Sequence, residues 1–260
     1  SNLRHLFSSY SYNDIVRIHR VYCKSVSGPN QIFKIDESQS HHLIRALRLK
    51  EDDIVEVFDG QGISAHCKII KLSKKYCEVE KAGEPLYQLA PKRILTAIIP
   101  IIKKNNFNFM IQKLTEIGVN KFIVYKPDLI DQSVAKKNFS GVIEKSHEII
   151  INVCKQCGNN FLPEIEHKLN LKEAIMQLED SDEIFSFDTE AHEYFNQYEL
   201  GEDSSIAIVT GPESGFSDEE LELIKMQNIK KRYLGQNILR AETAPIYASS
   251  LIKNHFDKIE

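Results

Sequence analysis

The first part of the chain alternates hydrophobic and polar residues in short runs separated by turn residues. Alternation with a period of two is typical of half-buried β-strands. Strands are therefore expected at residues 18–22, 31–35, 54–58, 64–70 and 76–80. Asp59-Gly60 predicts a tight hairpin turn, and a helical run at residues 41–49 has Ser38 or Ser40 as its expected cap. Several short strands and one helix predict a small β-barrel.

From about residue 92 onward, short apolar runs alternate with amphipathic segments of helical periodicity. The apolar runs predict strands at residues 94–99, 121–125, 183–187, 206–210 and 232–234. The amphipathic segments predict helices at residues 106–116, 140–157, 171–178 and 218–227, and from residue 243 onward. Strands that alternate with helices indicate an α/β fold, in which a parallel sheet is covered by helices on both faces.

This change of pattern predicts the domain organisation. Residues 1–15 are expected to be an amino-terminal extension, residues 16–85 the β-barrel domain, and residues 86–260 the α/β domain. The boundary falls near Gly83-Glu-Pro-Leu86, where turn residues separate the two patterns.

Composition excludes several classes of protein. Hydrophobic residues make up 42% of the chain and charged residues 27%, as in an ordinary globular protein. Because no apolar run approaches the roughly 20 residues of a membrane span, we expect no membrane span, no secretory signal and a cytoplasmic location. The five cysteines are odd in number and irregularly spaced, which indicates a reducing compartment. Cys154 and Cys157 have no second Cys or His pair nearby, so no metal site is expected.

Charge is unevenly spread along the chain, although the formal net charge is only −4. Residues 1–85 contain 13 Lys and Arg against 11 Asp and Glu, whereas residues 86–260 contain 20 against 26. The amino-terminal part is therefore the better surface for a nucleic acid, helped by local clusters rather than by a strong overall field.

Residues 206–217 combine an apolar strand, a tight turn and the start of a helix. Gly211 and Gly215 permit a close backbone approach, and Pro212 stiffens the turn. Ser217 and Glu220 have the spacing of a capping box for the helix that follows. The sequence has neither G-x-x-x-x-G-K-[ST] nor G-x-G-x-x-G, which argues against a kinase, an NTPase and a nicotinamide dehydrogenase. The loop suits a flat, weakly charged nucleoside.

A second unit of this kind spans residues 233–245. Gly235 ends the strand, and Pro245 suits the first turn of the following helix. Apolar side chains beside Arg240 are compatible with a nucleobase pocket, whereas Arg240 and Glu242 could equally form an ion pair that braces the loop. Both loops are expected at the carboxyl edge of the sheet, where open α/β folds bind ligands.

The two loops resemble the second and third cofactor loops of the SPOUT class of S-adenosylmethionine-dependent RNA methyltransferases, and the sequence looks most like the RsmE family within that class. The likeness runs from about Arg17 onward and includes Arg20-Val-Tyr22, residues 42–49, Phe58-Asp-Gly60, Gln156-Cys-Gly158 and both loops. It implies a SPOUT trefoil-knotted parallel-sheet domain preceded by a PUA-like β-barrel domain. It also implies a homodimer that methylates N3 of a specific uridine in 16S ribosomal RNA of the small subunit, with S-adenosylmethionine as cofactor.

The resemblance assigns roles to residues of this sequence. Cofactor binding is implied for Phe187, Thr210, Gly211, Pro212, Glu213, Gly215, Leu234, Gly235, Ile238, Leu239, Thr243 and Ala244. For RNA binding we expect Arg17, Arg20, Arg45 and Arg48, of which the last two share a face of the predicted helix. For catalysis we expect Arg240 to stabilise the developing anion, with Glu213 or Glu242 accepting the proton or orienting Arg240.

The sequence departs from the family pattern at Ser214, Lys155 and Asn159, where the family usually has Gly, Glu and Arg. Two alternatives therefore stay open. One is a SPOUT methyltransferase that acts on another RNA site, either a base or a ribose 2′-hydroxyl. The other is an RNA-binding ribosome assembly factor without catalysis, which predicts RNA binding without affinity for the cofactor.

Overall fold

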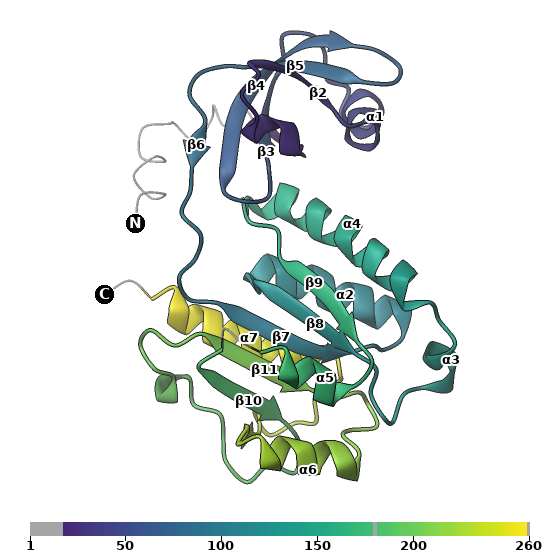
Figure 1. The fold of residues 1–260 in the computed structure, drawn as a ribbon, viewed down its shortest axis with the longest axis vertical. Helices are drawn as coiled ribbons and strands as arrows, with labels where there is room; N and C mark the ends of the chain where they lie inside the picture. The colour runs from purple at the N-terminus through teal and green to yellow at the C-terminus, as the bar shows by residue number, and fades with distance from the viewer. Residues whose placement is uncertain (1–17, 179–180, 259–260) are drawn as a thin grey trace. The chain divides into compact units, whose positions relative to one another are not determined.

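A computed structural model describes residues 18–178 and 181–258 of the chain. The chain divides into two compact units that meet between Gln88 and Leu89. Each unit has its own sheet and its own buried core, so each is described by itself (Figure 1).

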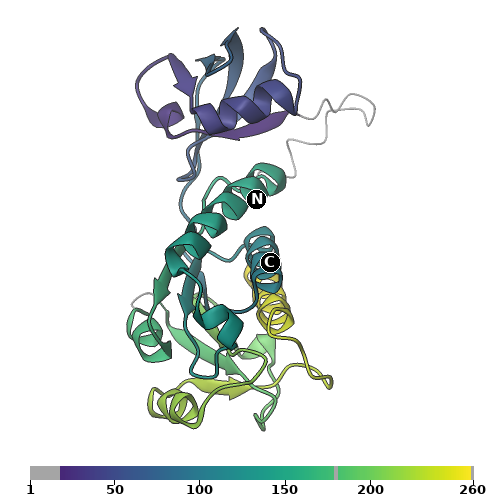
Figure 2. The same cartoon turned by 90° about the vertical axis from the view of Figure 1, so that its right-hand side faces the viewer.

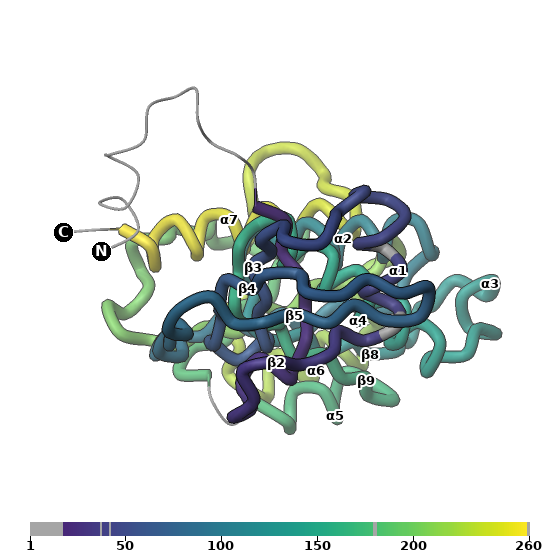
Figure 3. The backbone as a smooth tube through the Cα atoms, turned by 90° about the horizontal axis from the view of Figure 1, so that it is seen from above, coloured from purple at the N-terminus to yellow at the C-terminus, as the bar shows by residue number. Residues whose placement is uncertain are grey.

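The first unit is built on a sheet with the strand order β1-β3-β4-β5-β2, and β6 pairs with β4. Figure 3 labels β3, β4, β5 and β2 of this sheet. Its strands are β1 (His19–Tyr22), β2 (Ile32–Ile35), β3 (Ile54–Phe58), β4 (Ile63–Leu72), β5 (Cys77–Lys81) and β6 (Leu86–Tyr87). β1 and β3 are parallel, and the other pairs are antiparallel. The five strands predicted from alternation are confirmed, because their alternate residues form the core.

The Asp-Gly turn between β3 and β4 is also confirmed. Asp59 accepts hydrogen bonds at Oδ1 from the backbone N–H groups of Gln61 (2.7 Å) and Ile63 (3.0 Å). Gly60 and Gly62 have φ angles of 78° and 103°, in the left-handed region that glycine adopts without strain.

The helix of this unit differs from its predicted position. α1 spans Glu37–Arg45, so it begins and ends four residues earlier than expected. Ser40 lies within the helix and is no cap, because its hydroxyl donates to the carbonyl of Ile35 (2.8 Å) and accepts from the N–H of Cys77 (3.0 Å). Arg48 has a φ of 52° and lies beyond the helix, so the prediction that Arg45 and Arg48 share one helix face is wrong.

The second unit contains a fully parallel sheet with the strand order β12-β10-β11-β7-β8-β9. Its strands are β7 (Leu95–Pro100), β8 (Lys121–Tyr125), β9 (Glu164–Lys168), β10 (Glu183–Phe187), β11 (Ile206–Thr210) and β12 (Lys230–Arg232). Every residue of β7 and β11 is buried, as expected for central strands that helices cover on both faces. The predicted α/β architecture follows from these continuous apolar runs.

Helices flank this sheet on both sides (Figures 1 and 2). They are α2 (Lys104–Ile117), α3 (Gln132–Ala135), α4 (Phe139–Cys157), α5 (Leu171–Met176), α6 (Asp218–Met226) and α7 (Thr243–Phe256). α2 and α7 pack together on one face, where α4 also lies against α2, and α5 and α6 lie on the other face. None of the described helices is long and apolar enough to cross a membrane.

Candidate functional site

A cavity of about 770 Å³ lies at the carboxyl ends of β10, β11 and β12. It is bounded by the loop after β11 and by the loop between β12 and α7, the two loops expected to lie side by side. Of the predicted cofactor residues, the cavity is lined by Phe187, Thr210, Gly211, Pro212, Glu213, Gly215, Leu234, Gly235, Ile238, Leu239 and Ala244. Thr243, the first residue of α7, is not among the lining residues.

The loop after β11 is held by backbone and capping interactions. The N–H of Gly215 donates to the carbonyl of Pro212 (2.8 Å), and Gly215 adopts a φ of 79°. The predicted capping box is present, because Ser217 Oγ accepts from the N–H of Glu220 (3.1 Å) while Glu220 Oε1 accepts from the N–H of Ser217 (2.9 Å). Ser217 Oγ also donates to Asp128 Oδ2, which ties the loop to the segment after β8.

Burial perturbs one carboxyl of this capping box. Glu220 is only 4% exposed, and burial raises the pKa of its carboxyl above the ordinary value. The hydrogen bond from the N–H of Ser217 lowers this pKa, because it stabilises the charged form of the carboxyl. The negative charge of Asp128 raises the pKa further. Glu220 therefore favours its neutral form more than an exposed glutamate does.

The apolar side chains of the loop before α7 differ in how deeply they are buried. Leu234 is buried, Leu239 is half-buried, and Ile238 is 87% exposed although it lines the cavity. The carbonyl of Arg240 accepts from the N–H groups of Thr243 (3.0 Å) and Ala244 (3.1 Å), which closes the turn into α7.

Two of the three predicted catalytic residues line the cavity. Arg240 and Glu213 are exposed lining residues, whereas Glu242 is buried and outside the lining. Among the described ion pairs, none joins Arg240 to Glu242, so the structure does not support a bracing ion pair. Glu242 Oε2 is buried without a hydrogen-bond partner among the described residues, which leaves an acceptor beside the Arg240 turn.

The lining has the character of a nucleoside site rather than a phosphate site. Its volume falls within the range of about 300–1,000 Å³ that is typical of small-molecule pockets. Thr210 Oγ1 is buried without a hydrogen-bond partner among the described residues, so a ligand donor or acceptor can satisfy it. A Cβ at Gly211 would lie 3.3 Å from the Phe216 ring, so a side chain at this position would press on the ring beside the cavity. These features fit an adenosine-containing cofactor.

The sequence analysis missed several lining residues. Asp188, Thr189 and Ala191 follow the end of β10, and Tyr233 precedes Leu234. A signal was present for Asp188, because a polar residue that directly follows a buried strand lies at the carboxyl edge of the sheet. The side chain of Asp188 is partly committed, since its Oδ1 accepts from the N–H of Glu190 (3.2 Å).

The predicted RNA-binding arginines have different environments. Arg17 lies outside the described residues. The Arg20 side chain is only 10% exposed, since it pairs with Glu56 (3.0 Å) and its guanidinium lies 4.3 Å from the Phe58 ring centroid. Arg45 and Arg48 are both exposed. Arg20 is therefore held within the first unit, while Arg45 and Arg48 remain accessible from solvent.

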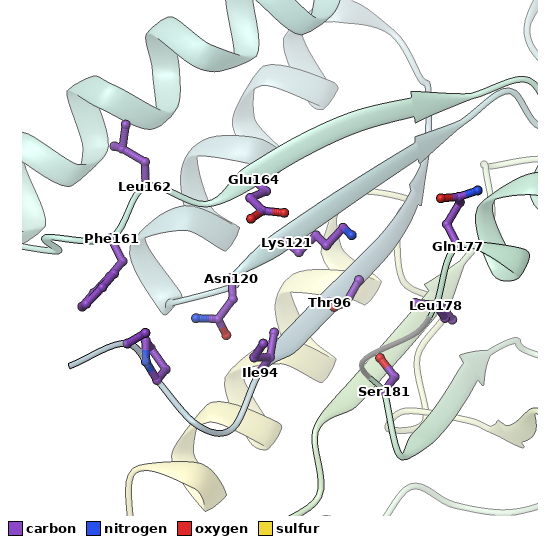
Figure 4. A pocket seen from close by; sticks show the side chains of 12 residues that line it. Ile94, Thr96, Asn120, Lys121, Phe161, Leu162, Glu164, Gln177, Leu178 and Ser181 are labelled. Carbon is purple, nitrogen blue, oxygen red and sulfur yellow. The ribbon is translucent and has the colours of Figure 1, made fainter. Parts of the chain in front are cut away.

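A second, smaller cavity of about 200 Å³ lies at the opposite edge of the parallel sheet (Figure 4). Thr96, Lys121 and Glu164 line it from the amino-terminal ends of β7, β8 and β9. Open α/β folds bind their ligands at the carboxyl ends of the strands, which favours the larger cavity as the functional site.

Comparison with known proteins identifies the family. A family model described as an RNA methyltransferase domain matches residues 90–253, which is more than half of the chain. The chain belongs to this RNA methyltransferase family. A second model, described as an RNA methyltransferase PUA domain, matches residues 35–82 of the same chain. These matches fall in the second and first compact units, respectively.

Named members of the family resemble the whole chain. Ribosomal RNA small subunit methyltransferase E of Buchnera aphidicola is 28% identical over 253 residues, which cover 92% of this chain and 94% of the relative. The Bacillus subtilis protein of that name is 27% identical over 234 residues, covering 85% and 89%. The resemblance to the RsmE family is confirmed.

A solved structure confirms the fold class. Ribosomal RNA small subunit methyltransferase E from Neisseria gonorrhoeae, bound to S-adenosyl methionine, superposes with a TM-score of 0.78 at 22% identity. The match covers 91% of this chain and 97% of the other. The predicted fold class, a SPOUT-type parallel-sheet domain after a PUA-like domain, is therefore confirmed. The trefoil knot stays a prediction, and so does the closure of the first sheet into a barrel, because β1 and β2 end the strand order without pairing with each other.

Proposed function

We propose that this RNA methyltransferase transfers a methyl group from S-adenosylmethionine to N3 of a specific uridine in 16S ribosomal RNA of the small subunit. The cavity between the two loops carries the proposal, because its lining combines glycine backbone, apolar side chains and the Thr210 hydroxyl, which has no hydrogen-bond partner in the described part of the chain. The names of the Buchnera aphidicola and Bacillus subtilis relatives support the choice of ribosomal RNA, and a cytoplasmic location belongs to the same proposal.

The residues around the cavity suggest how the acceptor is activated. The bound cofactor would supply an electrophilic methyl group on its sulfonium sulfur. N3 of uracil is a poor nucleophile until its proton leaves, so the site must favour the uracil anion. Arg240 is exposed at the cavity, where its permanent charge can stabilise negative charge on the adjacent uracil oxygen. Glu213 at the cavity, or Glu242 behind the Arg240 turn, can accept the proton or orient Arg240.

RNA binding is assigned to the first unit. Arg45 and Arg48 are exposed cations on a unit that matches a PUA-domain model, and guanidinium groups suit phosphate oxygens. Arg20 supports this surface through its contacts with Glu56 and Phe58 rather than by meeting phosphate directly.

A homodimer is part of the proposal. Tyr247 is 40% exposed on α7, and Ile246 and Leu251 of the same helix are only partly buried. This leaves an apolar strip that a second copy can cover. Sedimentation analysis of the wild type and a Tyr247→Glu variant tests it, since the charged variant should shift the protein toward monomer.

The deciding experiment combines cofactor binding with mapping of the modification. Calorimetric titration of the purified protein with S-adenosylmethionine should show binding, and small subunits from a deletion strain should accept one methyl group on a uridine base. Mass analysis of the digested 16S RNA separates base methylation from ribose 2′-hydroxyl methylation. Methylation on ribose would replace N3 as the target, and RNA binding without cofactor binding or turnover would favour an assembly factor.

The departures at Ser214, Lys155 and Asn159 are compatible with the cavity. Ser214 lacks a positive φ angle, so serine fits this position as readily as glycine does. Lys155 and Asn159 are not among the residues that line the cavity. None of the three substitutions therefore argues against cofactor binding.

A further inference from the structure

The exposed Tyr194 and the half-buried Tyr233 form an aromatic pair beside the cavity. The rings of Tyr194 and Tyr233 have centroids 5.6 Å apart and are tilted by 60°. Tyr233 lines the cavity, whereas Tyr194 is 55% exposed and outside the lining. The pair therefore extends from the cavity wall to the open surface.

The backbone fixes this pair in place. Tyr194 forms a parallel bridge with Tyr233, flanked by hydrogen bonds from Tyr233 N–H to the carbonyl of Glu193 (2.9 Å) and from Phe195 N–H to the carbonyl of Tyr233 (3.0 Å). Phe195 is only 1% exposed, and its ring meets Phe185 and Phe187 edge-on at centroid distances of 5.3 and 5.2 Å. Because Phe195 anchors the segment in the core, the backbone of its neighbour Tyr194 is held at the surface.

The arginine beside the pair is already engaged within the protein. Arg232 pairs with Glu193 (3.2 Å) and with Glu199 (3.0 Å). What this surface offers is therefore an aromatic face rather than a charge, and an aromatic face suits a nucleobase better than a phosphate. An RNA base that is methylated at a ring nitrogen must leave its stack, and it then needs a new stacking partner near the cofactor.

We propose that Tyr194 and Tyr233 form a stacking platform for an unstacked base of the RNA substrate at the mouth of the cavity. The proposal rests on the proposed function, since it takes the target to be an RNA base. The adenine of the cofactor is a different occupant. It belongs inside the cavity, and Tyr194 does not line the cavity.

The chain contains no tryptophan, so a single Tyr194→Trp substitution makes a fluorescent reporter at the platform. Tyr198→Trp is the matched control, because Tyr198 is 71% exposed in the same connection between β10 and β11 but contacts His255 instead (6.3 Å between ring centroids). Titration with protein-free 16S RNA should quench the fluorescence of Tyr194→Trp and leave that of Tyr198→Trp unchanged. Equal responses of both reporters would overturn the platform.

Kinetics provide the second test. Tyr194→Ala should raise KM for small subunits by about tenfold, as expected for loss of one stacked base. The Kd for S-adenosylmethionine and the thermal midpoint should match the wild type. Tyr194→Phe should restore KM because it keeps the ring, and Tyr198→Ala should behave as the wild type.

Failure of the platform and failure of the proposed function give different results. If the wild type methylates 16S RNA but Tyr194→Ala has an unchanged KM, the platform is wrong and the function stands. If Tyr194→Ala weakens cofactor binding instead, the pair contacts the cofactor and the proposal is overturned. If the wild type fails to methylate 16S RNA while Tyr194→Trp is selectively quenched by RNA, the platform stands and the proposed reaction is wrong.

Discussion

The hydroxyl of Tyr125, at the carboxyl end of β8, donates a hydrogen bond of 2.7 Å to the backbone carbonyl of Thr210, at the carboxyl end of β11. β7 lies between these strands in the sheet, so the bond passes across the end of an intervening strand. Tyr125 is fully buried, and burial raises the pKa of its phenol well above the ordinary value. The phenol therefore stays neutral and keeps its proton for Thr210, where the cofactor loop begins.

Replacing Tyr125 with phenylalanine removes this hydrogen bond and keeps the ring. We expect the free energy of unfolding to fall by about 1 kcal/mol, the usual net worth of one hydrogen bond. The affinity for S-adenosylmethionine should also fall, because the carbonyl that fixes the start of the loop loses its donor. Urea unfolding and calorimetry measure the two effects. Tyr198→Phe, which alters an exposed tyrosine, should change neither quantity.

Gly211→Val tests the close approach of backbone and ring beside the cavity. Even a Cβ at this position would lie 3.3 Å from the Phe216 ring, and the valine methyl groups need still more room. We expect the variant to lose measurable binding of S-adenosylmethionine while its circular dichroism stays that of a folded protein. The matched control is Gly141→Val on α4, where an added Cβ meets nothing within 4 Å. Wild-type affinity in Gly211→Val would remove this loop from the cofactor site.

Glu220 should make stability depend on pH. Its pKa is raised in the folded protein above the ordinary value of 4.5, so the unfolded chain loses the proton first as pH rises. Its contribution to the free energy of unfolding should therefore fall as pH rises above 4.5, until the folded carboxyl has also ionised.

Glu220→Gln isolates this effect, because glutamine keeps the capping-box acceptor and carries no charge. The stability of the variant relative to the wild type should increase from about pH 4 to pH 7, measured by urea unfolding at each pH. Glu219→Gln, an exposed neighbour in the same helical turn, should follow the wild-type curve. A pH-independent difference for Glu220→Gln would contradict the raised pKa.

In the parallel sheet, the buried central strands were predictable from sequence, whereas the edge strand β9 was not. The bounds of β8 and β11 were predicted to the exact residue, because strands that are buried on both faces have continuous apolar sequences. β9 was missed because its sequence, Glu164-Ile-Glu-His-Lys168, is mostly polar. It lies at the edge of the sheet, and its pairing with β8 depends on tertiary structure rather than on local pattern.

The ends of α1 were misplaced for a similar reason. The run Glu37-Ser-Gln-Ser40 is polar, so its first turn has no apolar periodicity to reveal it. Ser40 is buried there by hydrogen bonds with Ile35, five residues away, and with Cys77, which is 37 residues away in the chain. Local sequence does not encode such contacts.

The candidate site was predictable where glycine and proline mark the loops. Gly211, Gly215 and Gly235 indicated two strand-turn-helix units in the sequence. The loops of both units line the cavity. Asp188 was missed although it directly follows a buried strand, because only the strand order β12-β10-β11 places the end of β10 between the two loops. That order follows from the topology of the sheet and has no signature in the local sequence.

Exposed arginines of the first unit should contribute to RNA affinity through phosphate contacts. Arg45→Ala and Arg48→Ala should each weaken binding of 16S RNA and reduce the slope of log K against log salt by about 0.7–0.9. Arg20→Ala should instead lower the thermal midpoint, because Arg20 pairs with Glu56 and covers Phe58. Filter binding at several salt concentrations separates these outcomes, and an unchanged slope for Arg45→Ala and Arg48→Ala would exclude phosphate contacts.

Arg240 should act on the chemical step rather than on cofactor binding. Its side chain is exposed at the cavity, while its backbone carbonyl closes the turn into α7 whatever the side chain is. Arg240→Ala should therefore keep the loop geometry and bind S-adenosylmethionine with nearly wild-type affinity. We expect its kcat to fall by about 10²–10³, the usual loss when one group that stabilises a developing anion is removed.

The charge-conserving variant Arg240→Lys distinguishes stabilisation of the anion from simple packing. Lysine retains a cation but not the planar guanidinium, so kcat should recover only part of the loss. Raising the pH should increase the rate of methyl transfer by Arg240→Ala more than that of the wild type. A uracil that is already ionised depends less on stabilisation by a nearby cation. Single-turnover methyl transfer across a pH series measures this. Equal pH profiles for the wild type and Arg240→Ala would show that Arg240 does not stabilise the uracil anion.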